Sequence, residues 1–256
     1  MNRADRAELR TLAIALLASL LLWNLPFGGV LLYPFKLLAT WLHELSHALA
    51  MELTGAGVDR VVIYRDTSGL AYSSSAQGAI SKPIIAAAGY MGTALWGAAL
   101  LVVTPTGRAA RRALLALAVL LCATAALVVD APDGDHFGPL AIAGIGGAFA
   151  AAAIALPDRW RVAVAHFVAA QSCVNALLDI RVLLRPAQVV NGLEVGASDA
   201  HNMANATFGT VERWAVWFWA IAWLAWSLAV LYVALRVSGR RALAEVAPFP
   251  RPPADG

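Results

Sequence analysis

Charged residues are scarce in this chain of 256 residues. Lys, Arg, Asp and Glu make up 14% of it, whereas a soluble globular domain usually holds about 25%. Hydrophobic residues account for 60%, and the formal net charge of +3 gives no basis for nucleic-acid binding. This composition excludes an ordinary soluble enzyme and predicts an integral membrane protein whose immediate surroundings are a lipid bilayer. We expect a single membrane domain over residues 1–240 and no separate soluble module.

Cysteine is nearly absent. Cys122 and Cys173 both lie in apolar runs, and two residues are too few for a disulfide framework. Cys173 also lacks a partner at metal-ligand spacing. Both are therefore expected to pack as small hydrophobic residues.

Proline is rare inside the apolar runs and falls at their edges, where it marks helix boundaries. Each run is close to the ~20 residues needed to cross the hydrocarbon layer. The predicted spans cover residues 11–32, 36–53, 83–104, 112–130, 137–156, 160–185 and 212–236. A short Pro- and Gly-containing segment joins the first two, so the predicted fold is an all-α membrane protein, a polytopic bundle of six or seven transmembrane helices. Residues 241–256 are expected to form a disordered tail.

The segment from residue 55 to residue 82 is the one long region without helical character. Two strand-like runs, Val58–Tyr64 and Leu70–Ser75, flank a turn of Asp, Thr, Ser and Gly, which predicts a β-hairpin over about residues 56–76. An exposed strand edge next to a metal site could pair with an extended substrate. An ordinary surface hairpin fits the sequence equally well.

The sequence His-Glu-Leu-Ser-His occupies residues 43–47, within the apolar segment Leu37–Leu53. Residues four apart share one face of a helix, so His43 and His47 can bind the same metal ion. Glu44 is placed to act as general base on a water at that metal. Ionisable residues inside a membrane are costly and usually functional, which favours a metal site over a pair of core histidines.

A catalytic zinc site needs a third protein ligand. In the span 160–185, Gln171, Asn175 and Asp179 form one polar stripe, which should face the bundle interior or a water-filled cavity. Asp179 is therefore one candidate ligand, and Asp199 is another.

Asp199 is expected to begin a short helix in the segment between the last two long spans. His201 follows it by two residues and is a further candidate for the ligand set or for the cavity around it. From the residues alone, both aspartates remain open as the third ligand.

Small residues and tryptophans are expected to serve packing. Gly89 and Thr93 form a small-xxx-small pair, as do Ala88 and Gly92, and such pairs let membrane helices approach closely. The last span holds five tryptophans that are predicted to anchor it at the membrane interface and face lipid, namely Trp214, Trp217, Trp219, Trp223 and Trp226.

The chain resembles the site-2 protease family of intramembrane zinc metallopeptidases, in particular a compact bacterial branch. The resemblance rests on the HELSH motif on an early apolar helix, the strand-like segment after it, the run AAGYMG at residues 87–92 and a late carboxylate. In that family the third ligand is the Asp of a late Asn-x-x-Pro-x-x-x-Leu-Asp-Gly motif. Asn191 and Asp199 have the same separation here, but Glu, Ser and Ala replace the Pro, Leu and Gly of the motif, so the match is by spacing only. The resemblance favours Asp199 over Asp179.

This resemblance implies a zinc-dependent endopeptidase of the bacterial cytoplasmic membrane that hydrolyses a peptide bond in or near a transmembrane segment of a membrane protein. It implies His43, His47 and an Asp as ligands of Zn²⁺ and Glu44 as the catalytic base. Side chains expected to line the cavity or orient the substrate are Gln171, Asn175, Asn191 and His201. The alternatives are a non-proteolytic zinc-binding membrane scaffold or regulatory protein, and a transporter.

The orientation in the membrane stays open at the level of sequence. Arginines near both termini favour the cytoplasm for both ends. The segments 54–82 and 105–112 are both basic, however, and they flank one span, so one of them must violate the positive-inside rule.

Overall fold

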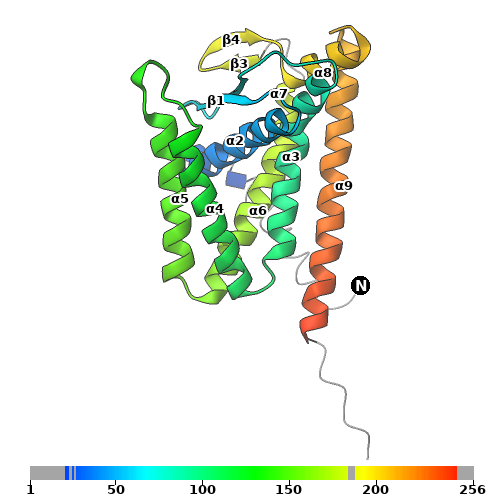
Figure 1. Cartoon of the computed structure of the whole chain (residues 1–256). Helices are drawn as coiled ribbons and strands as arrows, with labels where there is room; N and C mark the ends of the chain where they lie inside the picture. Colours follow the sequence, from blue (N-terminus) through cyan, green and yellow to red (C-terminus); the bar gives the residue numbers. More distant parts are fainter. Residues whose placement is uncertain (1–20, 23–24, 26, 184–187, 247–256) are drawn as a thin grey trace, which may run out of the picture.

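The computed structural model describes residues 21–22, 25, 27–183 and 188–246. Five long helices form an upright bundle, and a further helix, α2 (Gly28–Leu53), crosses it obliquely (Figure 1). The upright helices are α3 (Ser81–Val103), α4 (Gly107–Leu127), α5 (Phe137–Ala155), α6 (Asp158–Leu178) and α9 (Arg213–Val246). Within the described residues, these five are long and apolar enough to cross a membrane. The protein is therefore a multi-pass membrane protein.

The first predicted boundary is wrong, because α2 runs through Pro34 without interruption. A proline inside a helix removes one backbone hydrogen bond, but membrane helices tolerate that loss when their neighbours support them. Lys36, His43, Glu44, His47 and Glu52 interrupt the apolar stretches of α2, and it is not among the candidate spans. The predicted count of six or seven thus becomes five in the described part of the chain, and residues 11–20 lie outside it.

Two other predicted boundaries also shift. The span predicted over 160–185 ends at Leu178, and a short helix α7 (Ile180–Leu183) follows Asp179. The last span continues to Val246, so residues 241–246 are helical rather than part of a disordered tail. Residues 247–256 lie outside the described residues.

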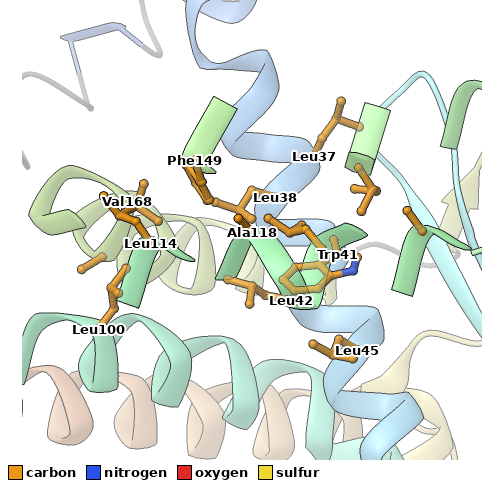
Figure 2. Packing of buried hydrophobic residues seen from close by; sticks show 14 of the residues in the cluster. Leu37, Leu38, Trp41, Leu42, Leu45, Leu100, Leu114, Ala118, Phe149 and Val168 are labelled. Atoms are coloured by element: carbon orange, nitrogen blue, oxygen red, sulfur yellow. The ribbon is translucent and has the colours of Figure 1, made fainter. Parts of the chain in front are cut away.

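One face of α2 builds the core. Leu38, Trp41, Leu42 and Leu45 follow the helical period and are all buried. They pack against apolar residues of the upright helices, which include Leu100, Leu114, Ala118, Phe149 and Val168 (Figure 2). The indole N–H of Trp41 also donates to the Thr124 hydroxyl at 3.0 Å. This packing fixes the rotation of α2 about its axis and therefore the direction of the opposite face, which carries His43, Glu44 and His47.

The predicted hairpin is confirmed. Strand β1 (Val58–Ile63) pairs antiparallel with β2 (Gly69–Ser73) directly after α2. Val61 of β1 uses its other edge to bond the chain at residues 128–130, with its N–H on the Val128 carbonyl (2.9 Å) and its carbonyl on the Asp130 N–H (2.8 Å). The edge of the hairpin left over for another strand is therefore that of β2.

The turn of this hairpin is tied to the loop before α5. The Arg65 guanidinium donates to both carboxylate oxygens of Asp135, at 2.9 and 3.2 Å, and lies over the Phe137 ring. Hydrogen bonds from Arg65 and from the Phe137 backbone N–H hold the pKa of Asp135 below its ordinary value. The hairpin and the acidic loop 130–135 therefore share one end of the bundle.

A second hairpin was not expected. Strands β3 (Gln188–Val190) and β4 (Leu193–Gly196) pair antiparallel around Asn191 and Gly192, in a segment predicted to be irregular. Both turn residues have positive φ, 50° and 74°. An Asn-Gly pair between short apolar runs is typical of a two-residue hairpin turn, and this was the signal that the sequence offered.

Candidate metal centre

Helix α2 places two imidazoles side by side. His43 and His47 are one turn apart on the same face, with 3.1 Å between their Nε2 atoms. The two rings are nearly perpendicular, with centroids 4.7 Å apart. Both Nε2 atoms thus point toward one position in front of the helix.

Asp199 reaches that position from the other half of the chain. It is the first residue of α8 (Asp199–Phe208), as predicted, and its Oδ2 lies 3.0 Å from Nε2 of His43 and 3.2 Å from Nε2 of His47. The residues that follow it, Ala200, Met203 and Ala204, are buried against α3 and α9. Helix packing therefore brings together a carboxylate and a histidine pair that are more than 150 residues apart in sequence.

Three ligand atoms meet here in a way that suits zinc. They lie within 4.8 Å of one another. In a tetrahedral zinc site with bonds of about 2.0–2.1 Å, neighbouring ligand atoms are roughly 3.3 Å apart, close to the separations between His43, His47 and Asp199. Two histidines and one carboxylate also form a known catalytic zinc ligand set, which leaves a fourth position open. The residues present therefore fit Zn²⁺.

A backbone carbonyl orients one of the ligands. The Nδ1–H of His47 donates to the carbonyl oxygen of Ile85 in α3 at 2.7 Å. This bond selects the tautomer in which Nε2 keeps its lone pair for a metal, and it holds the ring in place. The hairpin-side end of α3 thus supports the ligand set from behind.

Glu44 is buried beside the two histidines, with 6% of its surface exposed. The Ala71 backbone N–H of β2 is directed at its carboxylate. Gly69, also in β2, packs so closely on α2 that a Cβ there would lie 2.8 Å from Cγ of Glu44. A glycine is needed at this point, because any side chain would displace the carboxylate.

Two cavities meet at Glu44 and His43. The larger, about 600 Å³, reaches all three candidate ligands and is bordered by β2 on one side and by α8 on the other. The smaller, about 360 Å³, lies toward the start of α2 and the end of α6. Asn175 and Asp179 line this second cavity.

Among the other predicted site residues, Asn175 and Asp179 line one of these cavities, whereas Gln171, Asn191 and His201 line neither, and none of the five belongs to the converging ligand atoms. Of the described residues, Asp179 is not in the converging group, although the cavity it lines includes Glu44. Gln171 is buried one turn before Asn175 but does not line either cavity. The Asn191 N–H donates to the Ser68 hydroxyl at 3.1 Å, and Nδ1 of His201 lies 2.8 Å from the Ser198 hydroxyl. The polar stripe of α6 thus reaches a cavity through two of its three members.

Sequence reasoning missed two residues of α3 that lie against the histidines. A Cβ at Gly89 would collide with Nε2 of both His43 and His47, so this glycine, interpreted as a helix-packing residue, shapes the metal site. The ring of Tyr90 meets that of His43 edge-on at 4.8 Å and stacks on Trp223 at 5.2 Å. Trp223 is buried, so its predicted lipid-facing position is wrong. Only the clustering of small residues in α3 hinted at such a close approach.

Replacing Gly89 by Ala is expected to weaken zinc binding by about 10–100-fold, because the new methyl group occupies the space in front of both imidazole nitrogens. Zinc affinity measured by competition with a chelator tests this. Gly144→Ala in α5 is the matched control, since nothing lies within 4 Å of a Cβ there. Equal zinc affinities for the two variants would contradict the close approach of α3.

One family model matches most of the chain. The family is described as Peptidase M50B-like, and the match covers residues 11–234. The match includes all three converging ligands and Glu44. No curated protein and no solved structure matches this chain.

Proposed function

This chain belongs to the Peptidase M50B-like family, whose members are related to the site-2 proteases and are zinc-dependent metallopeptidases. On that premise we propose that it is an intramembrane zinc endopeptidase of the bacterial cytoplasmic membrane. Its substrate is a membrane protein, cut at a peptide bond in or near a transmembrane segment. The observation that carries this proposal is the convergence of His43, His47 and Asp199 beside the buried carboxylate of Glu44.

The chemistry of each side chain indicates its role in the proposed reaction. Zinc held by His43, His47 and Asp199 would lower the pKa of a water and polarise the scissile carbonyl. The Glu44 carboxylate takes a proton from the attacking water and passes it to the nitrogen of the leaving amine. Glu44 suits this role because it adjoins the ligand set on the same helix turn without belonging to it.

The free edge of β2 is the proposed docking strand for substrate. Val61 directs both its N–H and its carbonyl toward residues 128–130, so its partner Ala71 stands in a non-hydrogen-bonded pair. The backbone groups of Ala71 therefore point away from β1; its N–H is directed at Glu44, which leaves its carbonyl for a substrate strand. Gly69, Leu70 and Ala71 line the larger cavity, directly beside Glu44.

An extended substrate segment can add to this edge as a further strand. Such an arrangement addresses a physical requirement, because a peptide bond within an intact helix has its carbonyl engaged and its backbone shielded by side chains. A segment unwound onto β2 exposes its peptide bonds next to Glu44. Asn175 and Asp179 supply a polar lining through which water can approach from the second cavity.

Metal removal tests the proposed function. The purified protein, reconstituted with single-pass reporter segments, is expected to hold one zinc per chain by elemental analysis. Stripping the metal with a chelator should lower cleavage at least ~100-fold, and Zn²⁺ but not Mg²⁺ should restore it, because N-donor ligands favour zinc.

The matched control is the His43→Ala, His47→Ala double variant, which should neither retain zinc nor recover with added Zn²⁺. Undiminished cleavage by metal-free protein would show that the peptidase proposal is wrong. A protein that binds zinc stoichiometrically but cleaves none of the reporters would favour the non-proteolytic alternative.

A further inference from the structure

We propose that the larger cavity contains a subsite for an acidic side chain of the substrate and that Lys82 recognises that side chain. This inference rests on the proposed function, because it assigns part of the same cavity to the bound substrate. It adds a charge preference at one substrate position, a few residues from the bond that is cut. The position of Lys82 on α3, the charges that line the cavity and the amides beside Lys82 support it.

Lysine is rare in this chain, and both lysines border the site. Of the 19 Lys and Arg residues, only Lys36 and Lys82 are lysines. Lys36 lines the smaller cavity at Glu44, and Lys82 lines the larger one. Lys82 is exposed, and none of the ion pairs between described residues includes it. Its ammonium group can therefore pair with a negative charge that enters the larger cavity.

One face of α3 runs from Lys82 to the metal centre. Ile85, Ala86 and Gly89 follow Lys82 by three, four and seven residues, so all four share one side of the helix. Ile85 holds His47 through its carbonyl, and a Cβ at Gly89 would touch Nε2 of both ligand histidines. At ~1.5 Å of rise per residue, the start of this face at Lys82 lies about 10 Å along α3 from the metal centre. An extended peptide covers such a distance in about three residues.

The charges that line the larger cavity leave its Lys82 end positive. Glu44 and Asp199 are the only carboxylates among the described residues that line it, and both lie at the metal centre. Their two negative charges equal the two positive charges of a bound Zn²⁺, whose histidine ligands are neutral. The charge of Lys82 is then left without a counterpart among these lining residues. A substrate carboxylate would supply it, whereas a basic substrate side chain would meet a like charge.

Side-chain amides line the same cavity as Lys82. Asn202 lies about one turn after Asp199 on α8 and lines the cavity together with it. Gln77 also lines the cavity, and its Nε2 lies 3.4 Å from the Ser73 hydroxyl of β2. Amide N–H groups can donate to a carboxylate, and a carboxylate that pairs with a cation gains from such donors. A neutral glutamine in the substrate could use the amides but not the charge of Lys82, so the subsite should prefer Glu to Gln.

Binding of peptide hydroxamates to the zinc-loaded protein tests this preference without any cleavage. Uncharged host peptides carry a hydroxamate at either the N-terminal or the C-terminal end, which anchors them at the metal and fixes their register. One Glu, or Gln as its neutral counterpart, is placed at successive positions. At one position about two to four residues from the hydroxamate, Glu is expected to bind about 5-fold more tightly than Gln.

Variants of the two lysines assign the preference to one residue. Lys82→Gln should abolish the difference between Glu and Gln, and Lys82→Glu should reverse it in favour of Lys at the same position. Lys36→Gln is the matched control, because it removes the other lysine at the other cavity and should leave the preference unchanged. Retained zinc content shows that each variant is folded. Raising the salt concentration should weaken the preference for Glu, as expected for a partly exposed ion pair.

Equal affinities for Glu and Gln at every position would overturn the subsite, as would a preference that persists in Lys82→Gln. Lys82 would then be a residue that faces lipid phosphates rather than substrate. Absence of hydroxamate binding by the zinc-loaded protein would overturn both the subsite and the substrate cavity. The subsite and the peptidase can also fail separately. Reporter cleavage without a preference for Glu would refute only the subsite, whereas a Lys82-dependent preference in a protein that cleaves no reporter would refute only the peptidase.

Discussion

Changing Glu44 to Gln is expected to lower peptide-bond cleavage by about 10²–10⁴-fold, the usual contribution of general acid–base catalysis. The amide has nearly the same shape as the carboxylate but cannot accept the proton of the attacking water. Glu44 is buried next to the histidines, yet it is not one of the three converging ligands. Zinc content should therefore remain at one ion per chain.

The measurement pairs a cleavage assay with elemental analysis of the same preparation. Thr40→Ser is a suitable control, because Thr40 also borders the second cavity and its hydroxyl bonds the Thr67 carbonyl at 2.5 Å, which serine can reproduce. That variant should keep both zinc and most of the activity. Cleavage that survives Glu44→Gln would show that Glu44 is not the proton carrier. Loss of zinc in that variant would instead mean that Glu44 is part of the metal site.

The sequence predicted the features that depend on local periodicity, namely the histidine pair on one helix face and the first hairpin. The HELSH histidines had to share a face once the segment was helical, because residues four apart do so in any α-helix. The β1–β2 hairpin followed from two apolar runs around a polar turn. Pro34 shows the limit of local rules, since its effect on α2 depends on the helices packed around it.

Features that depend on long-range packing escaped prediction. The approach of α3 to the histidines at Gly89 is set by how two helices cross, and the sequence showed only that small residues were clustered there. The same applies to Trp223, which is buried because Tyr90 stacks on it.

The choice between Asp199 and Asp179 is the clearest case in which sequence left two options and the fold separates them. Both residues are carboxylates at the end of a helix, and each lines one of the two cavities beside Glu44. The carboxylate of Asp199 points at the two histidine nitrogens, whereas Asp179 ends α6 and borders the cavity toward Lys36. Asp199 as zinc ligand is thus the sharper prediction.

Asp199→Ala is expected to lower zinc affinity at least ~100-fold, because a two-histidine site loses one of the three protein ligands that catalytic zinc requires. Asp179→Ala should keep stoichiometric zinc and lose activity only to the extent that water or substrate uses the second cavity. Zinc affinity by chelator competition, measured on both variants and on wild type, separates the two roles. The comparison is well matched, since each variant removes one carboxylate of the same length within the same site.

The reverse pattern, with zinc retained in Asp199→Ala and lost in Asp179→Ala, would falsify the ligand assignment and would require α6 to move toward His43. An Asp199→Asn variant refines the result. Its side chain keeps the volume and one oxygen of the aspartate but loses the negative charge, so intermediate zinc affinity would show that charge as well as geometry holds the ion. Asp199, the first residue of α8, would then contribute its negative charge to a metal site whose two histidines lie on α2, and the packing of α8 against α3 and α9 would hold it there.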